Sequence, residues 1–406
     1  MPSAFIHPFA SPSRESFIRI ERGEGALVWD ESGRELVDGM ASLWYNAIGH
    51  GRDEMADVIA AQVRKLGAYS TFDPFTNEPA ERLAEELRQI APTPNARVFF
   101  TSSGSESIDT AMKLARMAHV QAGQPQRKLI ISRTRGYHGV AYGGTSVQGI
   151  APYKENFGPY VDEVATVPAE DIEAVATLMS QRSNEIAAII TEPVQGAGGV
   201  FPPPDGYLQS LRKLCDQHGA YLIFDEVITG YGRTGSWFAA HHYGVSPDFA
   251  TFAKGITSGY IPLGGVFVGL APTAALESDP DFFLMHGFTY SGHPTACAAG
   301  LKNLEIMRRE GLVERAKHIG DRLGGGLQAL AADGVVESVR GIGGMWALAV
   351  RPDQDAKAMR DHMLNTGGVI VRALADGLVF CPPLVITDEQ IDTCVDVLAA
   401  AVNAQS

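Results

Sequence analysis

The stretch "YLIFDEV" (221–227) combines a short apolar run with two carboxylates at its end. An apolar run of this length is typical of a buried β-strand. Similar runs recur along the chain between segments with helical spacing of apolar residues, such as 78–90 and 205–218. Strands that alternate with helices predict an α/β fold, with a largely parallel central sheet flanked by helices. The other predicted strands are "ARVFFT" (96–101), "KLIIS" (128–132), "AAIITEPV" (187–194) and "GGVFVGL" (264–270).

The two ends of the chain carry different patterns. "GALVWDESGRELVDG" (25–39) predicts two short strands joined by a turn. From about residue 298 a long helical pattern begins, followed by predicted strands near 335–350, 368–371 and 378–381 and a helix near 388–402. We therefore expect a large domain and a smaller α+β domain, the latter formed by both ends of the chain. The expected boundaries are 1–50 for the N-terminal segment, 51–297 for the large domain and 298–406 for the small domain.

Composition excludes several classes of protein. The 406 residues carry 33 basic and 47 acidic side chains, a net charge of −14, and the basic residues form no cluster. Nucleic acids and anionic membranes reward clustered Lys and Arg, so neither is an expected partner. The four cysteines are widely spaced, which fits reduced thiols. No metal-ligand motif, signal peptide or apolar stretch of roughly 20 residues is present, so we expect a soluble cytoplasmic protein without a metal.

Asp225 and Glu226 stand at the carboxyl end of the strand predicted in "YLIFDEV". Open α/β sheets bind ligands in a crevice at this end of their parallel strands. A carboxylate there can also simply cap the turn that follows. Position alone leaves both interpretations open.

A second candidate feature is "FFTSSGSESIDTAMKLARMA" (99–118), where a strand leads through a Ser/Gly turn into a helix. Free backbone N–H groups, hydroxyls and the helix dipole at such a point make a phosphate site. Ser103 and Glu106 also fit the S-x-x-E capping box, which requires no ligand. The two interpretations are compatible, because capping leaves other N–H groups free.

A third feature is "RGYHGVAYGG" (135–144), which places Tyr137 and His138 on a loop after the strand at 128–132. An aromatic ring at this position is suited to stack on a planar ligand. Ordinary packing or surface exposure of a Tyr-His pair is the alternative.

Lys254 lies in "TFAKGITSGYIPLGG" (251–265), among apolar and glycine-rich neighbours. Lysine is rarely buried, because desolvation of its charge is costly. A lysine in such surroundings has a lowered pKa and forms Schiff bases with carbonyl compounds. Pyridoxal phosphate requires an imine-forming lysine, an anion beside its pyridinium nitrogen and a phosphate site. The chain offers all three, so the sequence predicts pyridoxal phosphate as cofactor.

These segments resemble the class III (ω-type) aminotransferases, which are pyridoxal-phosphate enzymes of fold type I. The resemblance covers nearly the whole chain, from "VDGMASLWYNAIGHG" to "RALADGLVFCPPLVIT". Its most specific part is an ordered set of short motifs. These are "TSSGSES", "YHG", "TEPVQGAGG", "FDEVITGYGRTG", "FAKGITSGYIPLGG" and "TYSGHP".

The resemblance implies a role for each matching residue. Lys254 would bind the cofactor as a Schiff base and move the proton between the substrate Cα and C4′, and Asp225 would pair with the pyridinium nitrogen. The phosphate would be held within one chain by a serine–glycine turn and would be reached from the other subunit by Thr289. The remaining implied contacts to the cofactor are Ser103, Gly104 and Ser105 at the phosphate, Tyr137 and Val227 on the ring faces, and His138 and Glu192 nearby.

Resemblance also places two residues at the substrate. Trp44 would line the pocket for the amine side chain, and Arg372 resembles the mobile arginine that pairs with a substrate carboxylate in the amine:pyruvate branch. An ordinary surface arginine is the alternative for Arg372. Ile228 stands where GABA- and ornithine-type relatives have glutamine, which favours the ω-amine and β-alanine:pyruvate branch.

The implied protein is a homodimeric aminotransferase, with a tetramer as the alternative assembly. It would move an amino group from an ω-amino acid or primary amine to a keto acid, most simply pyruvate. One competing hypothesis keeps the fold and cofactor but makes the enzyme an aminomutase or a decarboxylating transaminase. Another makes it a non-catalytic binding protein on the same scaffold, although a scaffold role places no demand on Lys254.

Overall fold

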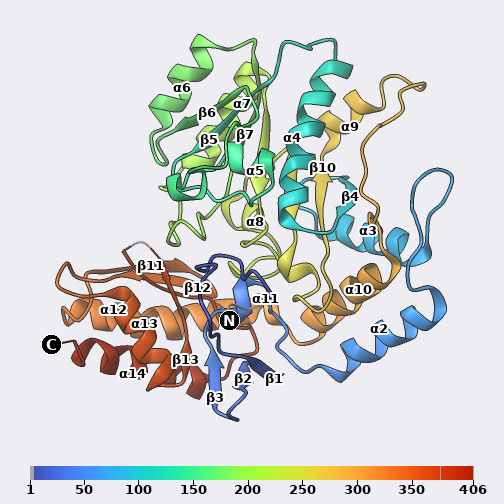
Figure 1. Ribbon diagram of the computed structural model, residues 1–406. Helices are drawn as coiled ribbons and strands as arrows, with labels where there is room; N and C mark the ends of the chain where they lie inside the picture. Colours follow the sequence, from blue (N-terminus) through green and yellow to red (C-terminus); the bar gives the residue numbers. More distant parts are fainter. Residues whose placement is uncertain (1–3, 375, 406) are drawn as a thin grey trace.

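A seven-stranded sheet forms the centre of the larger part of the molecule (Figure 1). The computed structural model describes residues 4–374 and 376–405. The strand order is β4-β10-β9-β8-β7-β5-β6, and β10 alone runs antiparallel to its neighbours. The predicted α/β class with a mostly parallel sheet is therefore confirmed. The strands are β4 (Arg97–Thr101), β5 (Leu129–Arg133), β6 (Val164–Val167), β7 (Ile186–Thr191), β8 (Tyr221–Asp225), β9 (Phe249–Phe252) and β10 (Gly264–Val268).

Helices cover both faces of this sheet, so the side chains of its strands are buried on both sides. The apolar face of α4 packs on one side, where Ile108 and Ala111 share a cluster with Ile223. On the other side Leu211 and Cys215 of α7 share a core with Phe224. The helices of this part are α4 (Gly104–Gln121), α5 (Tyr142–Ser146), α6 (Ile172–Gln181), α7 (Tyr207–His218), α8 (Ala239–Tyr243) and α9 (Leu270–Leu276).

Two four-stranded sheets lie in the lower part of the view in Figure 1. One joins β1, β2 and β3 to β13, so that the N-terminal segment pairs with the C-terminal region, as the sequence predicts. The other has the order β11-β12-β15-β14. The strands are β1 (Ile20–Glu24), β2 (Leu27–Asp30), β3 (Glu35–Asp38), β11 (Ser338–Ile342), β12 (Met345–Ala349), β13 (Val369–Ile370), β14 (Arg372–Leu374) and β15 (Gly377–Phe380).

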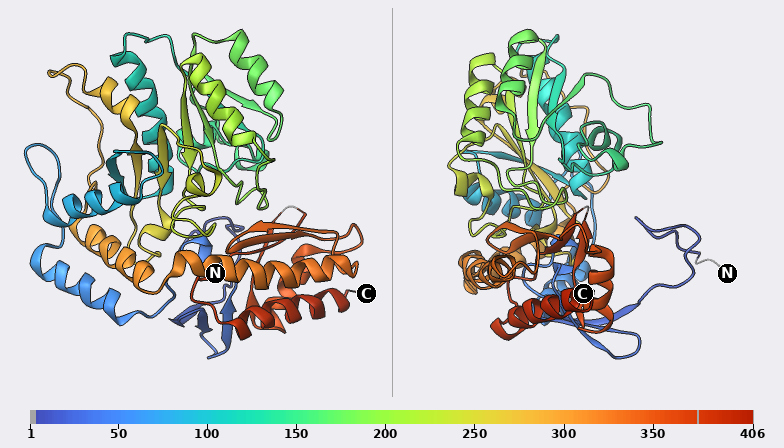
Figure 2. Two further views of the ribbon diagram at one scale, coloured as in Figure 1. Left: turned by 180° about the vertical axis from the view of Figure 1, so that it is seen from behind. Right: turned by 90° about the vertical axis from the view of Figure 1, so that its left-hand side faces the viewer.

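The remaining helices connect and cover these sheets. In α3 the Asn77 side chain accepts a hydrogen bond from the Ala80 N–H, and Pro79 lies in the first turn, both typical helix starts. The stretch before β1 leads away from the body of the molecule in the right-hand view of Figure 2. The helices are α1 (Ala41–Trp44), α2 (Asp53–Leu66), α3 (Glu78–Ile90), α10 (Pro294–Arg309), α11 (Leu312–Ile319), α12 (Gly325–Ala332), α13 (Ala356–Asn365) and α14 (Asp388–Asn403).

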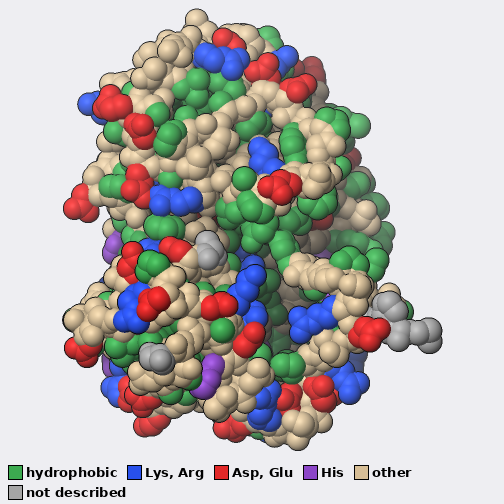
Figure 3. Space-filling view, turned by 60° about the vertical axis from the view of Figure 1, so that its left-hand side comes forward, with side chains coloured by type: hydrophobic (Ala, Val, Ile, Leu, Met, Phe, Trp, Pro, Cys, Tyr) green, Lys and Arg blue, Asp and Glu red, His purple; other side chains and the backbone are tan. Residues whose placement is uncertain are grey.

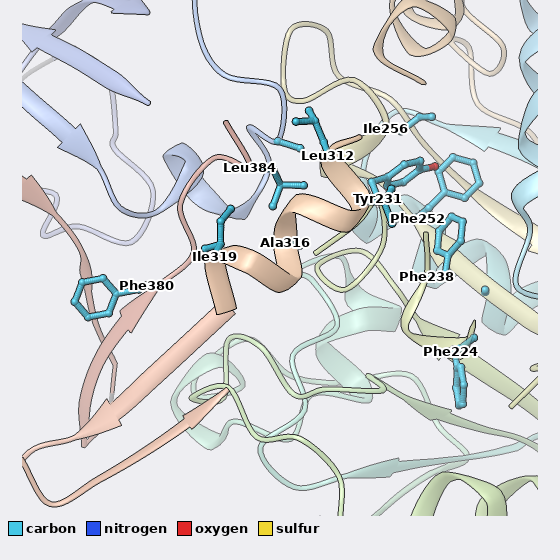
Figure 4. Packing of buried hydrophobic residues seen from close by; sticks show 14 of the residues in the cluster. Phe224, Tyr231, Phe238, Phe252, Ile256, Leu312, Ala316, Ile319, Phe380 and Leu384 are labelled. Atoms are coloured by element: carbon cyan, nitrogen blue, oxygen red, sulfur yellow. The ribbon is translucent and has the colours of Figure 1, made fainter. Parts of the chain in front are cut away.

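One hydrophobic core runs from the large sheet into the C-terminal region. In Figure 4, helix α11 with Leu312, Ala316 and Ile319 lies between the aromatic side chains around Tyr231 and the side chain of Phe380. Burial of such side chains contributes roughly 1.5–3 kcal/mol each. The two parts therefore share one continuous hydrophobic core. Among the described residues, no helix has the length and apolarity to span a membrane.

Candidate active site

Lys254 lies two residues after the end of β9 and starts a short turn that ends at Ile256. Its side chain lines a cavity of about 400 Å³ at the carboxyl ends of the parallel strands. Hydrophobic side chains gather where the upper and lower parts of the molecule meet in Figure 3. Burial lowers the pKa of Lys254, and the negative charges of Asp225 and Glu192 oppose that change. A lysine with a lowered pKa is a better nucleophile at neutral pH, which is the property the sequence predicts.

Asp225 faces the same cavity and is held by three hydrogen bonds. Its Oδ2 lies 2.8 Å from His138 Nδ1, and its Oδ1 accepts from the Val227 N–H at 3.1 Å and from Thr251 Oγ1 at 3.2 Å. The carboxylate and the imidazole are both almost fully buried. His138 therefore acts as a partner of the carboxylate rather than as surface or packing material. Such a fixed buried anion is suited to pair with a cationic ring nitrogen.

Glu226, the next residue, points elsewhere. Its carboxylate accepts hydrogen bonds from the Ala239 and Ala240 N–H groups at 2.9 and 2.7 Å, at the start of α8, and from the Thr229 hydroxyl. Burial raises the pKa of Glu226 to about 7. The sequence leaves open whether these carboxylates bind a ligand or cap a turn. In the structure Asp225 faces the cavity, and Glu226 caps a helix.

Glu192 connects two loops at the cavity through hydrogen bonds. Its Oε1 accepts from the Tyr137 N–H at 2.8 Å, and its Oε2 accepts from the Gly196 N–H at 2.9 Å. Burial raises the pKa of Glu192. The carboxylate fixes the backbone that carries Tyr137, so it shapes the cavity as well as lining it.

The N-terminus of α4 opens into the cavity. Ser103 caps the helix by accepting from the Glu106 N–H at 3.2 Å, and the Glu106 carboxylate accepts from the Ser102 N–H at 2.7 Å. The predicted capping interaction is therefore present, with Ser102 taking the reciprocal bond. The first N–H groups of a helix have no intrahelical acceptor, which leaves those of Gly104 and Ser105 for an anion. Ser103, Gly104 and Ser105 all line the cavity.

The structure brings nine of the predicted site residues together around this one cavity. They are Ser103, Gly104, Ser105, Tyr137, His138, Glu192, Asp225, Val227 and Lys254. Arg372 starts β14 and is not part of the cavity wall, although its charge acts on Lys254 and on Tyr137. No ion pair or hydrogen bond of its guanidinium occurs within residues 4–374 and 376–405.

Trp44 and Thr289 do not line the cavity. Trp44 is 3% exposed and belongs to a hydrophobic cluster that includes Ile228 and Met345. Its neighbour Tyr45 lines the cavity in its place. Thr289 is exposed, on the turn that precedes α10.

Sequence reasoning missed the partners of the site carboxylates. The contact of His138 with Asp225 spans 87 positions, and that of Glu192 with Tyr137 spans 55. Glu192 and Tyr137 follow the neighbouring strands β7 and β5, whereas His138 follows β5 and Asp225 ends β8, with β7 between these two strands. The short strand β9, which carries Thr251, was also absent from the predicted strands. The apolar character of residues 249–252 is the signal that could have found it.

Comparison with known proteins identifies the family. Residues 9–402 match the model of the class-III aminotransferases. Putrescine–pyruvate aminotransferase of Pseudomonas aeruginosa is 37% identical over 95% of this chain and 92% of its own length. Diaminobutyrate–2-oxoglutarate transaminase of Halomonas elongata is 37% identical over 95% of this chain and 90% of its own. A pyridoxal-phosphate-bound amine transaminase from an uncultivated Pseudomonas species superposes with a TM-score of 0.95 at 37% identity, covering 100% of both chains.

The chain therefore belongs to the class III aminotransferases, and the predicted family and fold are confirmed. It is a pyridoxal-phosphate-dependent enzyme. The residues at the cavity fit this cofactor. The start of α4 offers N–H donors for a phosphate, Asp225 offers a buried anion and Lys254 offers an amine. A Cβ on Gly104 would lie 3.0 Å from a Val227 methyl group, so a glycine there keeps this wall free of further side-chain atoms.

Proposed function

We propose that this aminotransferase moves an amino group from an ω-amino acid or a primary amine to pyruvate. In the first half-reaction the donor loses its amino group and becomes an aldehyde or ketone. In the second, pyruvate receives that group and becomes alanine. The observation that carries the proposal is the convergence of Lys254, Asp225 and the start of α4 on a single cavity.

The roles of the residues follow from their surroundings. When bound, pyridoxal phosphate supplies an aldehyde that exchanges amino groups and a ring that withdraws electrons from the substrate carbon. Lys254 Nζ would hold that aldehyde at rest and would carry the proton between substrate and cofactor atoms, helped by its lowered pKa. Asp225 would keep the ring nitrogen protonated. Tyr137 and Val227 would contact the ring.

Arg372 supports a carboxylate-bearing acceptor. Its guanidinium is half-buried, has no acceptor among the described residues and acts electrostatically on Tyr137 and Lys254. A guanidinium binds a carboxylate through two parallel hydrogen bonds. Ile228 in the cavity wall offers no hydrogen bond to the cofactor ring, which supports the ω-amine:pyruvate branch. Of the two relatives that are 37% identical, one is named for pyruvate and the other for 2-oxoglutarate, so the choice of pyruvate rests on Arg372 and Ile228 and not on these names.

A homodimer completes the proposal. Large hydrophobic side chains are exposed on the loops before α3 and before α10, among them Phe72, Phe75, Phe283, Met285 and Tyr290. Burial against a second copy would remove this apolar surface from water. Thr289 lies on the same loop and would reach the phosphate in the partner's site. Two inactive variants, Lys254→Ala and Thr289→Ala, should then regain activity when mixed, because one of the two sites in a mixed dimer is intact. Light scattering separates a dimer from a tetramer.

The deciding experiment is the absorbance spectrum of the pyridoxal-phosphate-loaded protein with a panel of amines and no acceptor. Conversion to the pyridoxamine form identifies donors, and reversal by pyruvate but not by 2-oxoglutarate supports the proposed acceptor. Reversal by 2-oxoglutarate alone would contradict it. Release of carbon dioxide, or product formation without any acceptor, would support a decarboxylating enzyme or an aminomutase.

A further inference from the structure

Tyr45 separates the active-site cavity from a second cavity. The first has a volume of about 400 Å³ and the second about 530 Å³, and the side chain of Tyr45 lines both. The second cavity is bordered by β1, β2 and the end of β3, and its polar side chains include Glu21, Arg22, Asp38 and His50. One aromatic side chain is thus common to the walls of both spaces.

The ring of Tyr45 rests on the backbone of Gly259. A Cβ built on Gly259 would lie 2.4 and 2.5 Å from two ring carbons of Tyr45, far inside contact distance. Gly259 also has a φ of +82°, which side chains other than glycine rarely tolerate. Glycine at this position is therefore what allows the Tyr45 ring to lie where it does.

A buried polar network fixes the segment that carries this ring. Ser258 Oγ accepts from the Ala47 and Ile48 N–H groups, each at 3.3 Å, and donates to Asn303 Oδ1 at 2.7 Å. Asn303 Nδ2 donates to the Gly255 carbonyl at 2.9 Å, and Gly255 is the residue after Lys254. The network therefore ties the position of Tyr45 to the turn that presents the reactive amine.

The end of β3 holds the other side of the same segment. Asp38 accepts from the Met40 N–H at 3.1 Å, from the Ser42 N–H at 2.7 Å and from His50 Nε2 at 2.9 Å. Asn46 Nδ2 in turn lies 2.8 Å from His50 Nδ1. The hydroxyl of Tyr45 itself makes no hydrogen bond within the described part of the chain. Its ring is thus positioned by packing and by the backbone around it.

We propose that Tyr45, held on Gly259, determines how long a donor side chain the enzyme accepts. The inference rests on the proposed amine-donor function and adds a specificity-determining residue to it. With the ring in place, donors end at Tyr45, which favours short amines. Without the ring, the two cavities merge, and longer straight-chain donors with a polar far end, such as α,ω-diamines, reach the polar walls beyond.

The experiment measures kcat/KM for a series of diamines of increasing chain length in the pyridoxal-phosphate-loaded enzyme. Tyr45→Ala should raise the ratio of long-donor to short-donor kcat/KM by about tenfold or more, the order of effect that pocket contacts produce. Tyr45→Phe should retain the original length profile. Gly259→Ala should shift the profile, because the added methyl group displaces the ring. Leu43→Ala, at an exposed position of the same segment, is the matched control.

A merely structural role for Tyr45 gives a different result, since it would lower kcat for all donors alike and leave the length profile unchanged. That outcome in Tyr45→Ala, with circular dichroism and cofactor loading as in the original enzyme, would overturn the inference. If the original enzyme aminates no acceptor at all, the proposed function fails instead. Calorimetric binding of α,ω-dicarboxylates of increasing length to the same variants then measures, without turnover, how long a ligand the cavity accepts. Equal length profiles in this assay would overturn the inference independently.

Discussion

The two walls of the active-site cavity are built in different ways. On the cofactor side, carboxylates are fixed by several hydrogen bonds each: three to Asp225 and two to Glu192. On the side of Tyr45, neither this wall residue nor Arg372, which lies outside the wall, makes a side-chain hydrogen bond within the described residues. There the wall depends on packing, as of Tyr45 on Gly259. The difference predicts that changes on the hydrogen-bonded side alter the rate for all substrates, whereas changes on the packed side alter which substrates fit.

The largest expected effect comes from the cofactor side. Lys254→Ala removes the amine that holds the cofactor and carries the proton, so turnover should fall by about 10⁴-fold or more. Steady-state kcat and the absorbance spectrum measure the loss. Lys302→Ala, at a surface lysine paired with Glu305, is the control for removal of a lysine. Normal turnover in Lys254→Ala would contradict the mechanism.

Asp225→Asn tests the fixed anion on the same wall. The amide retains much of the shape but loses the charge beside the ring nitrogen, so kcat should fall by about 10²–10³-fold, typical of losing one preorganised electrostatic partner. Glu226→Gln is the matched control, because this adjacent carboxylate faces α8 and not the cavity. Equal losses of kcat in both variants would contradict the assignment of Asp225 to the active site and of Glu226 to the support of α8.

Glu226 should act on stability rather than on rate. Burial raises its pKa from 4.5 to about 7 in the folded protein, so the folded state binds this proton more tightly than the unfolded state. Its stabilising contribution is fully present below about pH 4.5 and is lost as the pH rises towards about 7, a change of roughly 3 kcal/mol. Urea unfolding of Glu226→Gln at several pH values should therefore show a shallower decrease of stability over this window. An unchanged slope would assign the pH dependence to other groups.

The sequence predicts the cofactor side better than the donor side. Lys254, Asp225 and the start of α4 are local signals, because each combines a recognisable residue with the end of a strand or the start of a helix. Their partners His138 and Thr251 come from distant positions, and only the sheet order brings them to Asp225.

The donor side gives no such local signal. Trp44 and Tyr45 are adjacent aromatic residues, and the family resemblance favours Trp44 as the pocket residue. In the single chain, Tyr45 is the cavity-lining member of the pair, and Ala41, Ser42 and Trp44 all have positive φ values. Trp44 joins the cluster with Met345. A pattern of residue types does not encode such a backbone conformation.

Substitution of Arg372 has the smallest expected effect on the reaction rate. If its guanidinium pairs with substrate carboxylates, Arg372→Gln should raise KM for pyruvate and lower kcat/KM for carboxylate-bearing donors by about 10- to 100-fold, the loss expected for charge-assisted hydrogen bonds. Simple amines without a carboxylate should lose much less in the first half-reaction. Arg360→Gln, at an exposed arginine on α13, is the control. Equal losses for all substrates would instead indicate that Arg372 acts through its charge on Lys254 and not by binding a substrate carboxylate.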